Sequence, residues 1–160
     1  MKINSKIHFI GISGIGMSGI AELMLDKGYS IQGSDISVND NTKRLKKKGI
    51  KFFLGHNKKN IKYAHAVVYS SAIKKNNPEI KEAYIKKTPV LSRADMLSEL
   101  MKNKKSIAIA GSHGKTTTTS LVGNIFNEAG LDPTIVNGGI INSFSNNNRY
   151  GKGEWMIVEA

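Results

Sequence analysis

A glycine-rich segment at residues 111–117, Gly-Ser-His-Gly-Lys-Thr-Thr, carries residue types that suit a nucleoside triphosphate. Glycines let backbone N–H groups close around phosphate oxygens, and the Lys115 ammonium group can reach the β- and γ-phosphates. The Thr116 hydroxyl can ligate the Mg²⁺ ion that bridges these phosphates. Because Ile109 stands where the common G-x-x-x-x-G-K-[S/T] loop has its first glycine, this loop is a shorter variant of that motif. The alternative interpretation is a glycine turn that contains a Lys-Thr pair by chance. The predicted ATP-binding residues are Gly111, Ser112, His113, Gly114, Lys115, Thr116 and Thr117.

A second glycine-rich segment, residues 11–19, has the spacing of a dinucleotide-binding turn. A G-x-G-x-x-G pattern at Gly14, Gly16 and Gly19 follows an apolar, strand-like segment at 6–10. Apolar residues then recur at helical spacing at Met17, Ile20, Ala21 and Met24. Strand, glycine loop and helix in this order are typical of a Rossmann-type nucleotide site. The pattern fits NAD, another diphosphate-linked nucleotide, or a glycine turn that binds nothing.

A carboxylate follows the next expected strand, at residues 29–32. Asp35 lies 19 residues after Gly16, near the position where a dinucleotide-binding fold holds a ribose hydroxyl. Asp35 can equally hold its own loop through an Asx-turn. The sequence therefore offers one binding role and one structural role for this side chain.

Strand-like and helix-like segments alternate along the chain. Further strands are expected at 51–54, 66–69, 89–91, 107–110 and 155–160, and helices at 40–48 and 78–86 and after a capping box at 92–95. This alternation predicts an α/β fold: a Rossmann-like doubly wound parallel sheet, then the start of a P-loop ATPase-type domain. In that second domain, we expect Leu121, Val122, Ile125 and Ala129 to face inward, and residues 142–153 to form a polar loop.

A polar hinge at residues 103–105 predicts a boundary between domains 1–102 and 103–160. About 55 residues follow the hinge, which are too few for a complete nucleoside-triphosphate domain. We therefore expect the second domain to be incomplete, a carboxy-terminal domain to be absent, and the chain to be the amino-terminal part of a longer enzyme.

Composition narrows the class of protein. The 160 residues contain no cysteine and carry a formal net charge of +12. No apolar run approaches the roughly 20 residues that span a bilayer, and the first strand leaves no room for a signal peptide. Lysines are scattered in pairs without aromatic residues between them, which favours a solvated basic surface over a nucleic-acid-binding module, the alternative for this charge. We expect a cytoplasmic globular protein with no disulfide, no membrane insertion and no nucleic-acid partner.

The amino-acid sequence in and around both loops resembles the amino-terminal part of the Mur ligase family, and especially its alanine-adding branch. The matching segments are 8–21, 33–35, 70–73, 77–79, 93–97, 99–101, 110–118, 132–134, 137–139 and 158–160. They occur in the family's order over essentially the whole chain, and Gly-Met-Ser-Gly-Ile-Ala at 16–21 is typical of the alanine-adding branch. The branch that recycles murein tripeptide has a similar plan and is the nearest alternative. A nicotinamide-dependent oxidoreductase is the alternative from another class.

The resemblance implies that the first loop holds the diphosphate of a UDP-sugar rather than NAD. The implied substrate-binding residues are Gly14, Gly16, Met17, Ser18, Gly19, Asp35, His56, Ser70, Ser71 and Ala72. Ser70 and Ser71 can also be ordinary polar residues at a strand end, and His56 can be a turn residue.

The resemblance also implies ATP-dependent amide formation. The lactyl carboxylate of UDP-N-acetylmuramate attacks the γ-phosphate of ATP, and the amine of L-alanine then displaces phosphate from the acyl phosphate. Lys115 and Thr116 are the implied catalytic residues, and Thr116 and Glu159 the implied Mg²⁺ ligands. His113 either approaches the substrate carboxylate or shapes the turn. Amino-acid selectivity is expected to depend on segments outside this chain, and the pattern predicts no oligomeric state.

Overall fold

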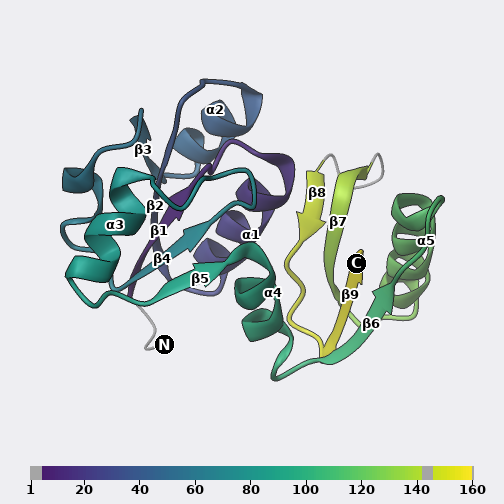
Figure 1. Ribbon diagram of the computed structural model, residues 1–160. Coiled ribbons are helices and arrows are strands. Elements are labelled where there is room, and N and C mark those ends of the chain that lie inside the picture. Colours follow the sequence, from purple (N-terminus) through teal and green to yellow (C-terminus); the bar gives the residue numbers. More distant parts are fainter. Residues whose placement is uncertain (1–4, 142–145, 160) are drawn as a thin grey trace. The chain divides into compact units, whose positions relative to one another are not determined.

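The computed structural model describes residues 5–141 and 146–159 (Figure 1). The chain divides into two compact units, Met1–Met96 (unit 1) and Leu97–Ala160 (unit 2). The division falls within helix α4 (Arg93–Met101), shortly before the polar hinge at 103–105. Each unit is described by itself.

Unit 1 contains a five-stranded parallel sheet in the order β3-β2-β1-β4-β5. Its strands are β1 (Lys6–Ile10), β2 (Ser30–Asp35), β3 (Lys51–Leu54), β4 (Ala66–Tyr69) and β5 (Val90–Ser92). The chain starts at the centre, adds strands on one side, and then returns to the other side of β1. This reversal makes the carboxyl ends of β1 and β4 the topological switch point, where open α/β sheets bind ligands. The expected Rossmann-like, doubly wound sheet is confirmed.

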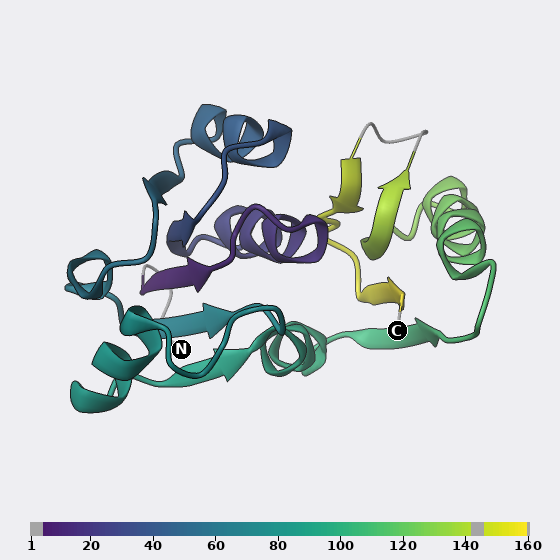
Figure 2. The same ribbon diagram turned by 45° about the horizontal axis from the view of Figure 1, so that its top comes forward.

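Helices cover both faces of this sheet, as Figures 1 and 2 show. The helical segments besides α4 are α1 (Ile15–Asp26), α2 (Asp40–Lys47), the 3₁₀ turn η1 (Lys58–Ile61) and α3 (Pro78–Ile85). Helix α1 packs with α2, and α3 packs with η1. Right-handed crossovers explain this arrangement, because connections that run in opposite directions along the sheet fall on opposite faces.

Local sequence signals set the beginnings of these helices. The side chain of Asn39 accepts a hydrogen bond from the Thr42 amide, and Thr42 Oγ1 accepts one from the Asn39 amide, which together form a capping box at α2. Asn77 caps α3, with Pro78 at the first helical position. The expected capping box at α4 is confirmed, since Ser92 and Asp95 exchange hydrogen bonds.

The core of unit 1 lies against β1 and β4. The α1 residues predicted to face inward, Met17, Ile20, Ala21 and Met24, are each at most 2 % exposed. On the other face, a buried cluster consists of Ile10, Ile61, Val67, Ile80 and Ala83. Burial on both faces holds the strand ends, and the loops that follow them, in fixed positions.

Unit 2 contains a four-stranded sheet in the order β6-β9-β7-β8. Its elements are β6 (Lys105–Ile109), α5 (Lys115–Glu128), β7 (Thr134–Ile141), β8 (Asn146–Arg149) and β9 (Trp155–Glu159). Strand β9 lies between β6 and β7 and is parallel to both, whereas β8 is antiparallel to β7. Strand β9 is thus the neighbour of the strand that leads into the glycine-rich loop at 111–117.

Two expectations about unit 2 were wrong. The polar loop expected at 142–153 contains β8, although residues 142–145 lie outside the described part of the chain. Strand β8 has no apolar alternation, because backbone pairing with β7 and a bond from the Asn137 amide to the Asn148 side chain fix it instead.

The inward face of α5 was also predicted incorrectly. Leu121 and Ile125 are 59 % and 65 % exposed, whereas Thr119 and Gly123 are buried. A Cβ atom on Gly123 would come within 2.5 Å of the Ile135 side chain. The helix approaches the sheet closely through small residues, so the apolar stripe that periodicity selects is not the one that packs.

Candidate nucleotide-binding sites

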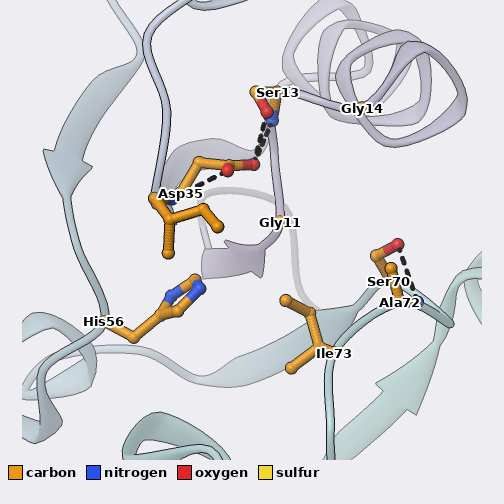
Figure 3. A pocket seen from close by; sticks show the side chains of 9 residues that line it. Gly11, Ser13, Gly14, Asp35, His56, Ser70, Ala72 and Ile73 are labelled. Carbon is orange, nitrogen blue, oxygen red and sulfur yellow. Dashed lines mark hydrogen bonds between the residues drawn. The ribbon is translucent and has the colours of Figure 1, made fainter.

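A pocket of about 260 Å³ lies at the carboxyl ends of the unit 1 strands (Figure 3). Its lining residues are Gly11, Ser13, Gly14, Asp35, Ile36, His56, Ser70, Ala72 and Ile73. They come from the end of β2 and from the segments that follow β1, β2, β3 and β4. Five of them had been predicted from the sequence, and Gly11, Ser13, Ile36 and Ile73 had not. These four share a position within four residues after the end of a strand, and this is the signal that could have identified them.

The conformation of Gly11 shapes the first loop. Its φ of +79° lies in the left-handed region, and a Cβ atom there would come within 3.1 Å of the Ser70 Cβ. The amides of Gly11 and Ile12 both donate to the Ser34 carbonyl oxygen, at 2.9 and 3.2 Å. The chain therefore turns tightly at the end of β1 and delivers Gly14 to the start of α1. The first amides of a helix have no intrahelical acceptors and favour an anion at this position.

Asp35 anchors this loop from the end of the neighbouring strand. Its Oδ2 accepts hydrogen bonds from the Ser13 amide at 2.9 Å and from Ser13 Oγ at 2.5 Å. Its Oδ1 accepts bonds from the amides of Ile36 and Ser37, at 2.8 and 3.4 Å. The Asx-turn considered from the sequence is thus present, and the carboxylate also shapes the glycine loop. Contact between Asp35 and a ribose stays a prediction.

Several predicted substrate-binding residues lie outside the lining of the pocket. Met17, Ser18 and Gly19 are buried within α1, and Ser18 Oγ donates to the Ile15 carbonyl oxygen at 3.0 Å. In this position they hold α1 against the sheet. Gly16 lies in the first turn of α1, and Ser71 is exposed. Contacts between these predicted residues and a ligand stay predictions. The residues in α1 would make such contacts through their backbone atoms.

A guanidinium group that the sequence analysis missed lies beside the first loop. A Cβ atom on Gly16 would come within 3.0 Å of Nη1 of Arg93, so this side chain covers the first turn of α1. Arg93 is exposed, and among the described residues we find no hydrogen-bond or ion-pair partner for its guanidinium group. A guanidinium group beside a helix N-terminus suits a diphosphate. Its position directly after β5 is the signal that could have identified it.

His56 enters the pocket wall from the segment after β3 (Figure 3). Its side chain is 13 % exposed, and its Nδ1 lies 3.0 Å from Ser34 Oγ and 3.4 Å from Glu79 Oε2. Burial alone would raise the pKa of Glu79. Hydrogen bonding and charge from His8, with hydrogen bonds from Ser34 and Asn60, instead hold the pKa of Glu79 below its ordinary value. Glu79 is therefore an ionised carboxylate buried behind the pocket.

The second loop connects β6 to α5 in unit 2. Gly114 has a φ of +74°, which turns the chain sharply into the helix that begins at Lys115. The Lys115 ammonium group folds back and donates to the Gly111 carbonyl oxygen at 2.6 Å. Ser112 and His113 are exposed within this loop, and Thr117 is exposed on the first turn of α5. The loop thus combines a helix N-terminus with a lysine that is already bent toward it.

Thr116 and Glu159 meet at the ends of neighbouring elements. Thr116 Oγ1 donates to Glu159 Oε2 at 3.0 Å, and Asn137 holds the helix start by donating to the Thr116 carbonyl oxygen. A hydroxyl and a carboxylate oxygen are ligands that fit Mg²⁺, which usually keeps several waters or phosphate oxygens. Within the described ranges no three His, Cys, Asp or Glu residues cluster as a further metal site. None of the described helices is long and apolar enough to cross a membrane.

The fold is α/β, and each unit places a glycine-rich loop of the kind that binds nucleotide phosphates at the ends of parallel strands. A family profile described as "Mur ligase family, catalytic domain" matches residues 6–105. The chain belongs to the Mur ligase family.

Relatives and solved structures support this assignment. A UDP-N-acetylmuramate–L-alanine ligase from Methylobacterium sp. (strain 4-46) is 56 % identical over 163 residues, which cover 100 % of this chain and 35 % of that protein. The enzyme of the same name from Rickettsia typhi is 60 % identical over 96 % of this chain and 31 % of its own length. The chain thus spans about a third of the length of these curated relatives.

Two solved structures share the arrangement of elements. The UDP-N-acetylmuramate–alanine ligase from Thermotoga maritima has a TM-score of 0.88 and 34 % identity, covering 96 % of this chain and 37 % of that chain. A UDP-N-acetylmuramate:L-alanyl-γ-D-glutamyl-meso-diaminopimelate ligase from Neisseria meningitides has a TM-score of 0.89 and 25 % identity, covering 98 % and 52 %.

Proposed function

We propose that this chain is the part of a UDP-N-acetylmuramate–L-alanine ligase that binds the UDP-sugar in unit 1 and ATP in unit 2. The observation that carries the proposal is the presence of two different phosphate loops, one in each unit. The first loop has no lysine and is anchored by a carboxylate, whereas the second contains Lys115 and faces Glu159. The names of the 54–60 % identical relatives support the choice of substrates.

Unit 1 offers a suitable environment for a nucleoside diphosphate. The diphosphate would lie at the N-terminus of α1, beside Gly14 and the guanidinium group of Arg93. The nucleoside would extend past Asp35 toward His56, because strand order places the ends of β2 and β3 successively on that side of β1. In this arrangement Ile36 and Ile73 supply apolar walls.

Unit 2 would supply charge neutralisation for phosphoryl transfer. In the proposed reaction, the lactyl carboxylate receives the γ-phosphoryl group of ATP, and the L-alanine amine displaces phosphate from the resulting acyl phosphate. Lys115 would stabilise charge on the transferred group, and positioning would do most of the remaining work. Thr116 and Glu159 would hold Mg²⁺, which neutralises phosphate charge when bound. Because this chemistry uses ATP and a UDP-sugar, we propose a cytoplasmic location.

Calorimetry with the 160-residue chain tests the first part of this proposal. We expect binding of UDP-N-acetylmuramate that is weaker than in a full-length relative, and no phosphate release when ATP and L-alanine are added. Tight binding of NAD without any response to the UDP-sugar would contradict the proposal and support a nicotinamide-dependent oxidoreductase.

A murein peptide ligase is the second candidate, since the Neisseria structure has the same arrangement of elements. A chimera that joins this chain to the remainder of the Rickettsia typhi enzyme tests the ATP site. Glu159→Gln in this chimera should raise the Mg²⁺ concentration needed for half-maximal phosphate release with L-alanine. Activity when this chain is joined to the remainder of the Neisseria enzyme, without activity when it is joined to the remainder of the Rickettsia typhi enzyme, would favour the second candidate.

A further inference from the structure

A buried polar network behind the unit 1 pocket has no role in the proposed reaction. At its centre, Glu79 is 0 % exposed at the start of α3. Its Oε2 accepts a bond from Ser34 Oγ at 2.6 Å, and its Oε1 accepts bonds from Asn60 Nδ2 at 2.6 Å and the Asn57 amide at 3.2 Å. Burying a carboxylate costs free energy even when several donors bind it, and packing of the core does not require a charged group at this position.

The network assigns the proton of His56 to one ring nitrogen. An ionised carboxylate only accepts hydrogen bonds, so the single hydroxyl proton of Ser34 is given to Glu79. Ser34 Oγ can then only accept at its 3.0 Å contact with His56 Nδ1, and Nδ1 must carry a proton. Glu79 Oε2, at 3.4 Å from the same nitrogen, favours that arrangement. Nε2 is left as the nitrogen available to a ligand.

The second histidine of the network is assigned in the opposite way. Gln32 Nε2 donates to the Asn60 carbonyl oxygen at 2.7 Å, which fixes the orientation of the Gln32 amide. The same Nε2 lies 3.3 Å from His8 Nδ1, which therefore accepts a hydrogen bond. In the neutral ring, the His8 proton is therefore on Nε2, which lies 3.3 Å from Glu79 Oε2. Glu79 Oε2 thus accepts the N–H group of His8 and lies 3.4 Å from the Nδ1–H group of His56, so the two neutral rings have different tautomers.

We propose that Glu79 is a positioning residue that keeps the proton of His56 on Nδ1, so that Nε2 accepts a hydrogen bond from the imide N–H of a uracil base. This inference rests on the proposed function for its ligand, a uridine diphosphate. His56 follows β3, two strands from the loop after β1, so it lies at the nucleoside end of the pocket rather than at the diphosphate end. The neutral Nδ1–H ring selects uracil, which has a donor at N3, over cytosine, which has an acceptor there.

Nitrogen-15 NMR of the histidine side chains tests the assignment, because the two neutral tautomers and the protonated ring have distinct chemical shifts. The chain has four histidines, and His56→Gln identifies the signals of His56. At pH 8 we expect the Nδ1–H tautomer for His56 in the unmodified chain. Glu79→Gln should shift His56 toward the Nε2–H tautomer. A protonated ring or an Nε2–H ring in the unmodified chain would overturn the proposal.

Affinities for UDP and CDP supply the functional measurement. Glu79→Gln should weaken UDP binding about tenfold, the value of roughly one hydrogen bond, and reduce the preference for UDP over CDP. The double variant Glu79→Gln/His56→Gln should bind UDP no more weakly than His56→Gln alone, because Glu79 acts through His56. Additive losses would overturn the positioning role.

A matched control separates positioning from stability. His8→Asn disturbs the same carboxylate oxygen without reaching the pocket, so it should lower stability but leave UDP affinity and the His56 tautomer unchanged. If Glu79→Gln does not fold, Ser34→Ala can be used, because it removes the acceptor of the His56 Nδ1 proton. Ser34→Ala should likewise shift His56 toward the Nε2–H tautomer. An unchanged His56 tautomer in this variant would contradict the proposal. An Nδ1–H ring in a chain that binds no UDP would instead contradict the proposed function and, with it, the uracil contact.

Discussion

The two glycine-rich loops are built in the same way and differ in the burial of the carboxylate beside them. In each, a loop or first-turn hydroxyl donates to a carboxylate at the end of the neighbouring strand. Ser13 bonds Asp35 across β1 and β2, and Thr116 bonds Glu159 across β6 and β9. A parallel sheet brings these residues together because neighbouring strands end at the same edge.

The difference lies in the use of the carboxylate. Asp35 is 7 % exposed and accepts four hydrogen bonds, two from Ser13 and two from the amides that follow it. Glu159 is half-buried beside a loop that contains a lysine. The comparison teaches that a strand-end carboxylate can be buried as the anchor of a glycine loop or lie half-buried beside a loop lysine.

The largest expected effect comes from the lysine that only the second loop has. In the Rickettsia typhi chimera, Lys115→Ala should lower turnover about 10²–10³-fold, or roughly 3–4 kcal/mol, because it removes a charge that stabilises phosphoryl transfer. UDP-sugar affinity, which we assign to unit 1, should change by less than about 0.5 kcal/mol. Lys105→Ala, on an exposed lysine of the same unit, is the control. Loss of UDP-sugar binding with normal ATP turnover would mean that the loops exchange roles.

A substitution in the first loop should affect binding with little effect on folding. Gly14 has a φ of −62°, and a Cβ atom there meets only the Gly11 carbonyl oxygen, at 3.6 Å. Gly14→Val should therefore fold but occupy the phosphate position, and UDP-sugar affinity should fall by roughly 2 kcal/mol or more. Calorimetry measures the affinity, with Gly14→Ala as a milder step in the series. Unchanged affinity in both variants would show that the first loop is only structural.

Paired amide substitutions test the different uses of the two carboxylates. Asp35→Asn replaces one of two saturated acceptor oxygens by a donor, so urea unfolding should show a loss of about 1–3 kcal/mol. Glu159→Gln, at a half-buried site, should change stability by less than about 0.5 kcal/mol. Equal losses in the two variants would remove the distinction drawn between the loops.

The smallest effect concerns stability in acid. The folded-state pKa of Glu79 is lowered below its ordinary value of 4.5, so its contribution to stability is present above that pH. The contribution is lost as pH falls below 4.5 through the folded-state pKa. The pH dependence of the unfolding free energy between pH 6 and pH 3 should be shallower in Glu79→Gln than in the unmodified chain. Parallel curves would show that Glu79 is not ionised behind the pocket.

Glycine spacing, strand-like apolar runs and capping residues predicted the Rossmann-like unit and the approximate position of both loops. Local rules suffice there, because a left-handed turn requires glycine and a strand buried on both faces requires a continuous apolar run. The same local rules selected the wrong face of α5. Its packing depends on how closely Gly123 approaches Ile135, and helical periodicity does not include that distance.

The sequence by itself determined which residues belong to each loop and that Asp35 has either a binding or a structural role. Only the tertiary structure decided that Asp35 holds Ser13, that Arg93 covers Gly16, and that Glu79 lies beside His56. These pairs come from different strands and helices, up to 77 positions apart for Arg93 and Gly16. Their contacts depend on strand order and register, because the order of a parallel sheet, and not the distance along the chain, sets which strand ends are neighbours.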